Sequence, residues 1–356
     1  MATLTPIFSA AEIRTAQEFI NQSNNVVILT HMSPDGDAMG SSLAMRHFLE
    51  AQGKHVSVIV PNAFPDFLAW LPKADEDIIY ESRRAEADAL LEQADLVICT
   101  DFNDPKRIGS LGDKLLTLTC RKMMIDHHLH PSDFPDLTLS YPSSPSTCEL
   151  VYRLISCLSP FASSPFASDI ATCIYTGMMT DTGNFSFNSN YPEMYQIVGE
   201  LVSLGVNKDE IYNRVFNAYS ADRMRLMGYC LYQKMRIFPE YHTALIYLSR
   251  KELYRFNFQS GDAEGIVNLP LQIKDIHYSC FMREDKVNST EVALAGGSKT
   301  KIKISLRSQG NRPVNVFAKD IFGGGGHANA SGGEYYGPLS EAVQRFLDNY
   351  QDYFVL

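Results

Sequence analysis

Residues 26–37, Val-Val-Ile-Leu-Thr-His-Met-Ser-Pro-Asp-Gly-Asp, decide the fold of this chain. The apolar run Val26 to Leu29 predicts a buried strand. Pro34 and Gly36 indicate a tight turn after it, and the sequence from Ala38 to Gln52 predicts a helix. A strand that leads through a polar turn into a helix is the repeating unit of an open α/β sheet.

The same pattern recurs on both sides of this segment. Ser9-Ala10-Ala11-Glu12 is a capping box that opens a helix running to about Asn21. Further predicted elements are strands at Val56–Val60, Leu96–Cys99 and Lys122–Ile125 and a helix at Ala85–Gln93. Strands that alternate with helices imply a doubly wound parallel sheet with right-handed crossovers.

Carboxylates and histidines follow three of these strands. They are His31, Asp35 and Asp37 after the first strand, Asp101 after Leu96–Cys99, and Asp126-His127-His128 after Lys122–Ile125; Asp181 follows an apolar helical stretch, Ile170–Met179. Because the carboxyl ends of parallel strands meet at one edge of a sheet, we expect these side chains to converge. Carboxylate oxygens mixed with imidazole nitrogens suit Mn²⁺ or Mg²⁺ better than structural zinc. The first hypothesis is a two-metal hydrolase of phosphate esters.

Each of these residues also has a purely structural interpretation. One of the two aspartates in 26–37 could simply cap the following helix, but that would leave His31 unexplained. A single histidine after a strand is usually a hydrogen-bonded core residue. Two adjacent histidines point in different directions, so His127 can ligate a metal while His128 faces a substrate. Asp181 alone would indicate a turn, and only the other segments make it a candidate ligand.

Composition bounds the possible functions. A chain of 356 residues that is 45% hydrophobic can bury a full core, and its length favours two domains. The net charge of −10 argues against a protein that coats long duplex nucleic acid, but leaves short anionic substrates open. Seven cysteines without a C-x-x-C pair argue against a disulfide framework. We therefore expect a cytoplasmic protein, with neither an export signal nor the roughly 18-residue apolar run of a membrane span.

The remaining sequence predicts a helical connector and a second, smaller α/β domain. We expect a catalytic domain at 1–190, a connector at 191–240 and a substrate-binding domain at 241–356. The connector carries predicted helices at Pro192–Leu204, Lys208–Asn217 and Ala221–Met235. The second domain contains short strand-like runs and the cluster Gly323-Gly324-Gly325-Gly326-His327. Four glycines let a backbone approach an anion and present amide N–H groups to it, although a flexible loop is the alternative.

A basic stretch precedes the glycine cluster. Between positions 299 and 319 the sequence has no acidic residue and carries Lys299, Lys301, Lys303, Arg307, Arg312 and Lys319. Alternation with apolar residues is also what an ordinary half-exposed strand shows. The planar guanidinium of Arg307 can hold a terminal phosphate through two hydrogen bonds. Arg283 is a weaker candidate, equally plausible as a surface residue.

In combination, these motifs resemble the DHH phosphoesterase superfamily, whose name describes Asp126-His127-His128. The segment Gly323–Gly332 resembles the glycine-rich signature of the DHH-associated domain, with Ser331 where relatives often carry alanine. Within the superfamily, the chain is most similar to oligoribonucleases that also dephosphorylate adenosine 3′,5′-bisphosphate. The resemblance implies hydrolysis of oligoribonucleotides of about two to five nucleotides to mononucleotides, and of the bisphosphate to AMP.

The resemblance also implies residue roles. His31, Asp35 and Asp101 would hold one ion, and Asp37, Asp101, His127 and Asp181 would hold the other, with Asp101 as the bridge. His128 would contact the scissile phosphate, while Arg307, Arg283, His327 and the four glycines Gly323 to Gly326 would bind the rest of the substrate. Two imidazoles among six ligands favour Mn²⁺ over Mg²⁺.

Four alternatives remain open. A phosphodiesterase specialised for linear di-adenylate would share every motif. Manganese pyrophosphatases share the first domain but not the Gly323 to His327 signature, and RecJ-type exonucleases are larger. A non-enzymatic nucleotide or RNA-binding module would be expected to have lost ligands. The sequence does not decide the oligomeric state, and a homodimer is among the options.

Overall fold

The computed structural model describes residues 4–159, 161–259, 261–287 and 300–354; Lys299 of the basic stretch lies outside them. The chain forms two compact units, Met1–Ala218 and Tyr219–Leu356. This division falls inside the expected connector 191–240, whose first two helices belong to the first unit and whose third belongs to the second. Within the described residues, no helix combines the length and the apolar character needed to cross a membrane.

The first unit contains a six-stranded sheet in which every neighbouring pair is parallel. Its strands, in the order β3-β2-β1-β4-β5-β6, are β1 (Asn25–Leu29), β2 (His55–Val60), β3 (Ile78–Ile79), β4 (Leu96–Thr100), β5 (Arg121–Asp126) and β6 (Leu137–Ser140). The predicted doubly wound parallel sheet is confirmed. The chain order reverses between β1 and β4, and such a switch point leaves a crevice at the carboxyl ends of the strands.

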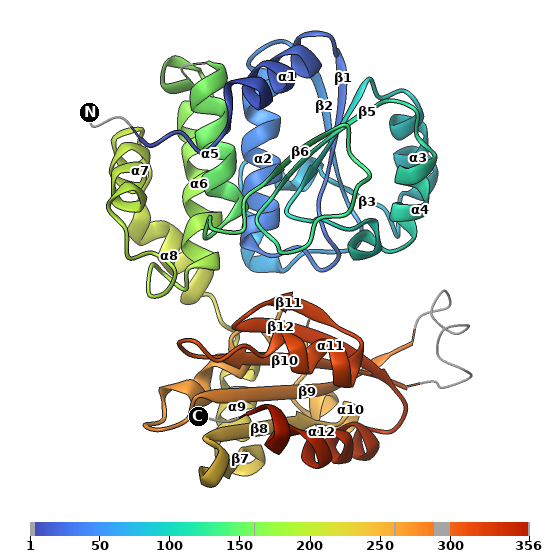
Figure 1. The fold of residues 1–356 in the computed structure, drawn as a ribbon, viewed down its shortest axis with the longest axis vertical. Helices are drawn as coiled ribbons and strands as arrows, with labels where there is room; N and C mark the ends of the chain where they lie inside the picture. Colours follow the sequence, from blue (N-terminus) through green and yellow to red (C-terminus); the bar gives the residue numbers. More distant parts are fainter. Residues whose placement is uncertain (1–3, 160, 260, 288–299, 355–356) are drawn as a thin grey trace. The chain divides into compact units, whose positions relative to one another are not determined.

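Helices cover both faces of this sheet (Figure 1). On one side lie α1 (Ala10–Asn21), α2 (Gly36–Glu50), α5 (Thr147–Leu158) and α6 (Ala167–Asp181), with α7 (Pro192–Ser203) and α8 (Lys208–Phe216) beyond them; on the other lie α3 (Arg84–Glu92) and α4 (Ser110–Thr117). Val26 and Ile28 pack into the first core, whereas Val27 and Leu29 pack into the second. Because both faces of the sheet are buried, Val26–Leu29 of β1 and Leu96–Cys99 of β4 are uninterrupted apolar runs.

Two helix termini differ from the prediction in ways that matter for the site. The capping box at Ser9 and Glu12 forms as expected, but α2 begins at Gly36 rather than near Ala38, because Asp35 is the residue that caps it. The helix α6 extends to Asp181 instead of ending at the apolar stretch. Asp37 therefore lies in the first turn of one helix, and Asp181 at the last residue of another.

Glycines let these helices approach closely. A Cβ atom on Gly36 would lie 2.3 Å from Oγ1 of Thr180, and one on Gly177 would lie 2.2 Å from Sγ of Cys148. Glycine therefore allows the start of α2, the start of α5 and the end of α6 to meet, and this brings Asp37 close to the carboxyl edge of the sheet.

The second unit contains a mixed six-stranded sheet, which confirms a second α/β unit. Its strands, in the order β11-β12-β10-β9-β8-β7, are β7 (Arg236–Phe238), β8 (Thr243–Leu248), β9 (Tyr278–Lys286), β10 (Thr300–Ser308), β11 (Gly325–His327) and β12 (Ala330–Tyr336). The pair β8/β9 is parallel and the other pairs are antiparallel.

Helices of the second unit pack in two groups. The helices α11 (Asn315–Phe322) and α12 (Leu339–Tyr353) share a core with Ile302, Ile304 and Leu306 of β10. The helices α9 (Ala221–Tyr229), which continues as a π-helical turn to Lys234, and α10 (Arg250–Arg255) share the other core. Since Ile302, Ile304 and Leu306 face the core that β10 shares with α11 and α12, the alternate residues of β10 face away from that core.

Candidate active site

Asp101 lies between two histidines at the switch point of the first sheet. It directly follows β4, while His31 and His127 follow the neighbouring strands β1 and β5. Its Oδ2 is 3.3 Å from Nε2 of His31, and its Oδ1 is 3.5 Å from Nε2 of His127. The two oxygens of one buried carboxylate thus face two different imidazoles, which is the arrangement that a bridging ligand requires.

The two aspartates at the start of α2 differ in their contacts. Asp35 accepts hydrogen bonds from the backbone N–H groups of Asp37 and Ala38, at 3.0 and 3.1 Å, and its Oδ1 is also 3.8 Å from Nε2 of His31. Asp37 is almost completely buried, and its Oδ2 is 3.8 Å from Nε2 of His127. The capping interpretation therefore holds for Asp35 and explains neither Asp37 nor His31.

Asp181 completes the cluster from the end of α6, with its Oδ2 3.3 Å from Nε2 of His127. Among the described residues of this unit, ligand-type atoms within 4.8 Å of one another form three groups: His31/Asp35/Asp101, Asp37/Asp101/His127 and Asp101/Asp126/His128. Asp101 belongs to all three groups. The structure thus brings together all six residues that the resemblance assigns to two ions.

The electrostatics of the cluster fit cations. Burial and the neighbouring Asp101 and Asp181 raise the pKa of Asp37 well above its ordinary value. Burial alone would lower the pKa of His31, but contacts with Asp101 and Asp35 outweigh it and raise that pKa to about 10. The pKa of His127 is also raised, since Asp101 and Asp37 outweigh its burial. Protons thus offset part of a surplus of buried negative charge. The oxygen and imidazole donors fit a pair of divalent ions such as Mn²⁺ or Mg²⁺.

Comparison with known proteins identifies the family. Residues 25–178 match the N-terminal domain of the DHH family, and residues 246–355 match the DHHA1 domain. The chain belongs to the DHH family. As a member it is a hydrolase of phosphoester bonds. We refer below to Met1–Ala218 as the DHH unit and to Tyr219–Leu356 as the DHHA1 unit.

Three known proteins match nearly the whole chain, two by sequence and one by fold alone. The chain is 28% identical over 324 residues to the bifunctional oligoribonuclease and PAP phosphatase NrnA of Thermus thermophilus, covering 91% of this chain and 88% of that protein. An exopolyphosphatase-related protein from Bacteroides fragilis has a similar crystal structure, with 47% identity, a TM-score of 0.88 and 98% coverage of each chain. The crystal structure of RecJ from Thermus thermophilus in complex with Mn²⁺ has a similar fold, with 13% identity and a TM-score of 0.53. The match covers 98% of this chain and 56% of the RecJ chain.

Asp126 orients His128 in the DHH unit. Asp126 is fully buried, accepts a hydrogen bond from the backbone N–H of His128 at 2.8 Å, and contacts Nδ1 of the His128 ring at 2.7 Å. This contact turns Nε2 of the same ring the other way, as a contact with a phosphate would require. Sequence reasoning gave Asp126 no role of its own, although its spacing from His128 was visible.

The segment Ser144–Cys148 was missed entirely. The carbonyl oxygen of Ser144 is 3.1 Å from Nδ1 of His127, so the opposite nitrogen, Nε2, faces the carboxylates. The backbone N–H groups of Thr147 and Cys148 donate to Asp37 at 2.6 and 2.9 Å, and the Thr147 hydroxyl donates to Oδ1 of Asp101 at 2.8 Å. The available signal was the spacing of Ser146 and Glu149, which indicates a helix start.

In the DHHA1 unit, strand register aligns two of the predicted substrate-binding residues. His327 of β11 pairs with Ala330 of β12, which pairs with Arg307 of β10. Directly paired residues project from the same face of a sheet, so His327 and Arg307 flank the small side chain of Ala330.

Arg283 lies on the same face but is engaged elsewhere. It pairs with Lys303, four residues along β10 from Arg307. Its Nη1 is 3.2 Å from Oδ2 of Asp285, and its guanidinium lies over the Phe258 ring at 5.2 Å. These contacts explain the residue structurally without any substrate.

The first two glycines of the cluster end α11. Gly323 has a φ of 62°, and the N–H groups of Gly323 and Gly324 donate to the carbonyls of Lys319 and Ala318, which ends α11. The N–H groups of Gly323 and Gly324 are thus used within the fold, and contact of these two glycines with a substrate stays a prediction. Binding of an anion by Gly325 and Gly326 stays a prediction.

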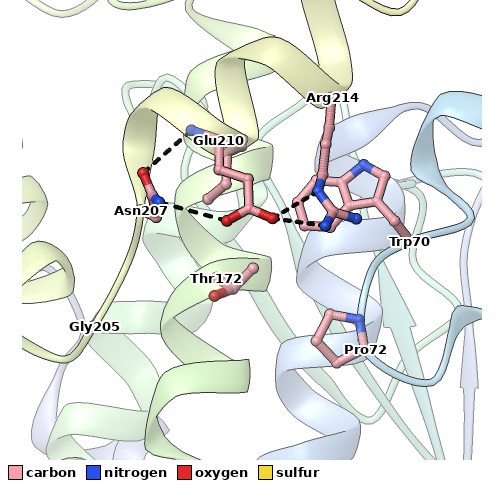
Figure 2. A pocket seen from close by; sticks show the side chains of 8 residues that line it. Trp70, Pro72, Thr172, Gly205, Asn207, Glu210 and Arg214 are labelled. Carbon is pink, nitrogen blue, oxygen red and sulfur yellow. Dashed lines mark hydrogen bonds and ion pairs between the residues drawn. The ribbon is translucent and has the colours of Figure 1, made fainter.

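A separate cavity of about 210 Å³ lies in the DHH unit (Figure 2). Its lining residues are Trp70, Pro72, Thr172, Gly205, Asn207, Glu210, Ile211 and Arg214. Glu210 holds the Arg214 guanidinium over the Trp70 ring, 5.0 Å from its centroid. None of the residues in the carboxylate cluster lines this cavity, so it is distinct from the candidate active site.

Proposed function

We propose that this protein hydrolyses short oligoribonucleotides to mononucleotides and adenosine 3′,5′-bisphosphate to AMP. The reaction would use two divalent ions, with Mn²⁺ preferred over Mg²⁺. The observation that carries the proposal is the position of Asp101, whose oxygens face His31 on one side and His127 on the other. The name of the Thermus relative, a bifunctional oligoribonuclease and PAP phosphatase, supports the substrate class.

The residues of the DHH unit would have different roles in the reaction. Two divalent ions held here would stabilise negative charge on the attacking and leaving oxygens of a displacement at phosphorus. His31, Asp35 and Asp101 would hold one ion, and Asp37, Asp101, His127 and Asp181 the other. His128, oriented by Asp126, would donate from Nε2 to the scissile phosphate. Positioning and charge stabilisation of this kind supply most of the rate in phosphoryl transfer.

The DHHA1 unit would hold the part of the substrate away from the scissile bond. Arg307 and His327 lie in one row of the sheet with only an alanine between them, so that a guanidinium and an imidazole would bind the same phosphate. Recognition by two side chains suits one end of a short substrate, and the net charge of −10 argues against binding of a long polymer. We also propose a cytoplasmic location, because seven cysteines without a C-x-x-C pair fit a reducing compartment.

Substrate profiling tests the proposal. The Mn²⁺-loaded protein is incubated with a ladder of 5′-labelled RNAs, with pApA, with adenosine 3′,5′-bisphosphate and with pyrophosphate, and Asp101→Asn serves as the inactive control. We expect the shortest RNAs and the bisphosphate to be hydrolysed. Turnover of pApA alone would indicate the di-adenylate phosphodiesterase, and no turnover by a protein that holds both ions would contradict the proposal.

A further inference from the structure

The start of α5 contacts both of the buried aspartates at the centre of the site. Thr147 is the first residue of this helix and is completely buried. Its backbone N–H donates to Oδ2 of Asp37 at 2.6 Å, and its hydroxyl donates to Oδ1 of Asp101 at 2.8 Å. One residue thus connects the two carboxylates, although they come from segments more than sixty residues apart in the chain.

The main chain of Asp101 is fixed by its own contacts, but the plane of its carboxylate is not. Its φ is 63°, in the left-handed region that residues other than glycine rarely adopt. Its N–H donates to the carbonyl of Ile125 on β5 at 3.0 Å, which fixes the main chain. The terminal torsion of an aspartate is broad, however, so the plane of the carboxylate is set by the groups around it.

The groups around the Asp101 carboxylate are not equivalent. The imidazole of His31 lies on the Oδ2 side, and the imidazole of His127 lies with the Thr147 hydroxyl on the Oδ1 side. An imidazole that ligates a metal cannot donate a hydrogen bond from the same nitrogen. Among these three neighbours, the Thr147 hydroxyl is therefore the one whose hydrogen bond to Asp101 is compatible with bound ions.

We propose that Thr147 is the positioning residue that sets the orientation of the Asp101 carboxylate and thereby the affinity of the site for its two ions. The inference rests on the proposed two-metal function. A neutral hydroxyl suits this task, because a lysine or arginine there would place a competing positive charge beside the ions. Partners that orient a ligand in this way typically contribute about 10- to 100-fold in metal affinity.

Paired variants separate the hydroxyl from the rest of the side chain. Thr147→Val keeps the shape and removes the donor, whereas Thr147→Ser keeps the donor and removes the methyl group. Thr243→Val is the matched control, because Thr243 is also completely buried and donates its hydroxyl to a backbone carbonyl, that of Tyr241, at 2.7 Å. Mn²⁺ binding to each metal-free protein is measured by electron paramagnetic resonance titration, alongside kcat and KM for a dinucleotide.

We expect Thr147→Val to weaken Mn²⁺ binding by about 10- to 100-fold and to lower kcat more than it raises KM, while Thr147→Ser and Thr243→Val stay near wild type. Wild-type Mn²⁺ affinity in Thr147→Val, or an equal loss in Thr147→Ser, would overturn the proposal. If Thr147→Val does not fold, Thr147→Ala against Thr147→Ser makes the same comparison. If no variant, wild type included, cleaves RNA, the titrations still decide the role of Thr147, and only the proposed substrate fails.

Discussion

The carboxylate cluster of the DHH unit and the His327–Arg307 row of the DHHA1 unit are built on two different principles of sheet geometry. In the first, parallel strands end side by side and deliver residues from distant segments to one buried point. In the second, antiparallel register aligns residues of neighbouring strands on one partly buried face. Because the buried residues share their neighbours, the effects of mutating them should not be additive. The effects of mutating the two residues of the row on substrate binding should be closer to additive.

The largest effect should come from the centre of the cluster. Asp101→Ala is expected to abolish turnover, because it removes the carboxylate that faces both histidines. His128→Ala should lose about 10²- to 10⁴-fold, the usual effect of one transition-state contact. The measurement is kcat on a dinucleotide together with metal content per chain. Equal losses in two proteins that both retain two ions would show that the role assigned to Asp101 is wrong.

Metal binding should depend on pH in a direction set by the histidines. The carboxylates raise the pKa of His31 to about 10 and also raise that of His127. Ions must therefore displace protons, and the apparent affinity for Mn²⁺ should rise with pH, by up to about tenfold per proton displaced for each pH unit. Titrations at several pH values and constant ionic strength, on protein stripped by chelation, measure this slope. We expect two ions per chain and higher activity with Mn²⁺ than with Mg²⁺; a pH-independent affinity would contradict the charge balance described here.

Much of the cluster could be predicted because strand ends are visible in a sequence. His31, Asp101 and His127 each follow an apolar run, and a parallel sheet brings such positions to one edge. Asp181 comes from a helix end, and its place depends on the close approach of helices at Gly36 and Gly177, which no single-sequence pattern reveals.

Contacts that support the ligands were harder to foresee. The spacing of Ser146 and Glu149 predicts where α5 begins, but not that the Thr147 hydroxyl meets Asp101. Such a contact depends on the rotation of a helix about its axis and on packing between segments distant in the chain. The way Gly323 and Gly324 end α11 was hard to foresee for a related reason, because a run of glycines is typical both of a loop and of a helix cap.

A smaller effect is expected from the row in the DHHA1 unit. Arg307→Ala and His327→Ala should each raise KM for a dinucleotide by about 10- to 100-fold, as expected for the loss of a charge-assisted contact of 1.5–3 kcal/mol, and leave the metal content unchanged. Hydrolysis of bis-p-nitrophenyl phosphate, which lacks the far end of the substrate, should be nearly unaffected. Lys319→Ala, an exposed change in the same basic stretch, is the control. An equal loss on both substrates would mean that the row supports folding or metal binding instead.

The smallest effect should come from Arg283, and its size shows how far along the sheet the substrate-binding row of His327 and Arg307 extends. Its guanidinium is already shared between Asp285 and the ring of Phe258, and contacts of this kind contribute about 0–1 kcal/mol each to stability. Arg283→Ala should therefore lower the melting temperature by a few degrees at most and change KM for a dinucleotide by less than about threefold.

Arg283 lies four residues along the sheet from the Arg307 row, or about 13 Å at the rise of a strand, which is beyond the next phosphate of a dinucleotide. The measurement is KM for a series of RNAs of increasing length, with Arg307→Ala in parallel. A loss confined to the longer RNAs would extend the binding face along β10, whereas an equal loss on the dinucleotide would contradict the assignment of the far end of the substrate to His327 and Arg307.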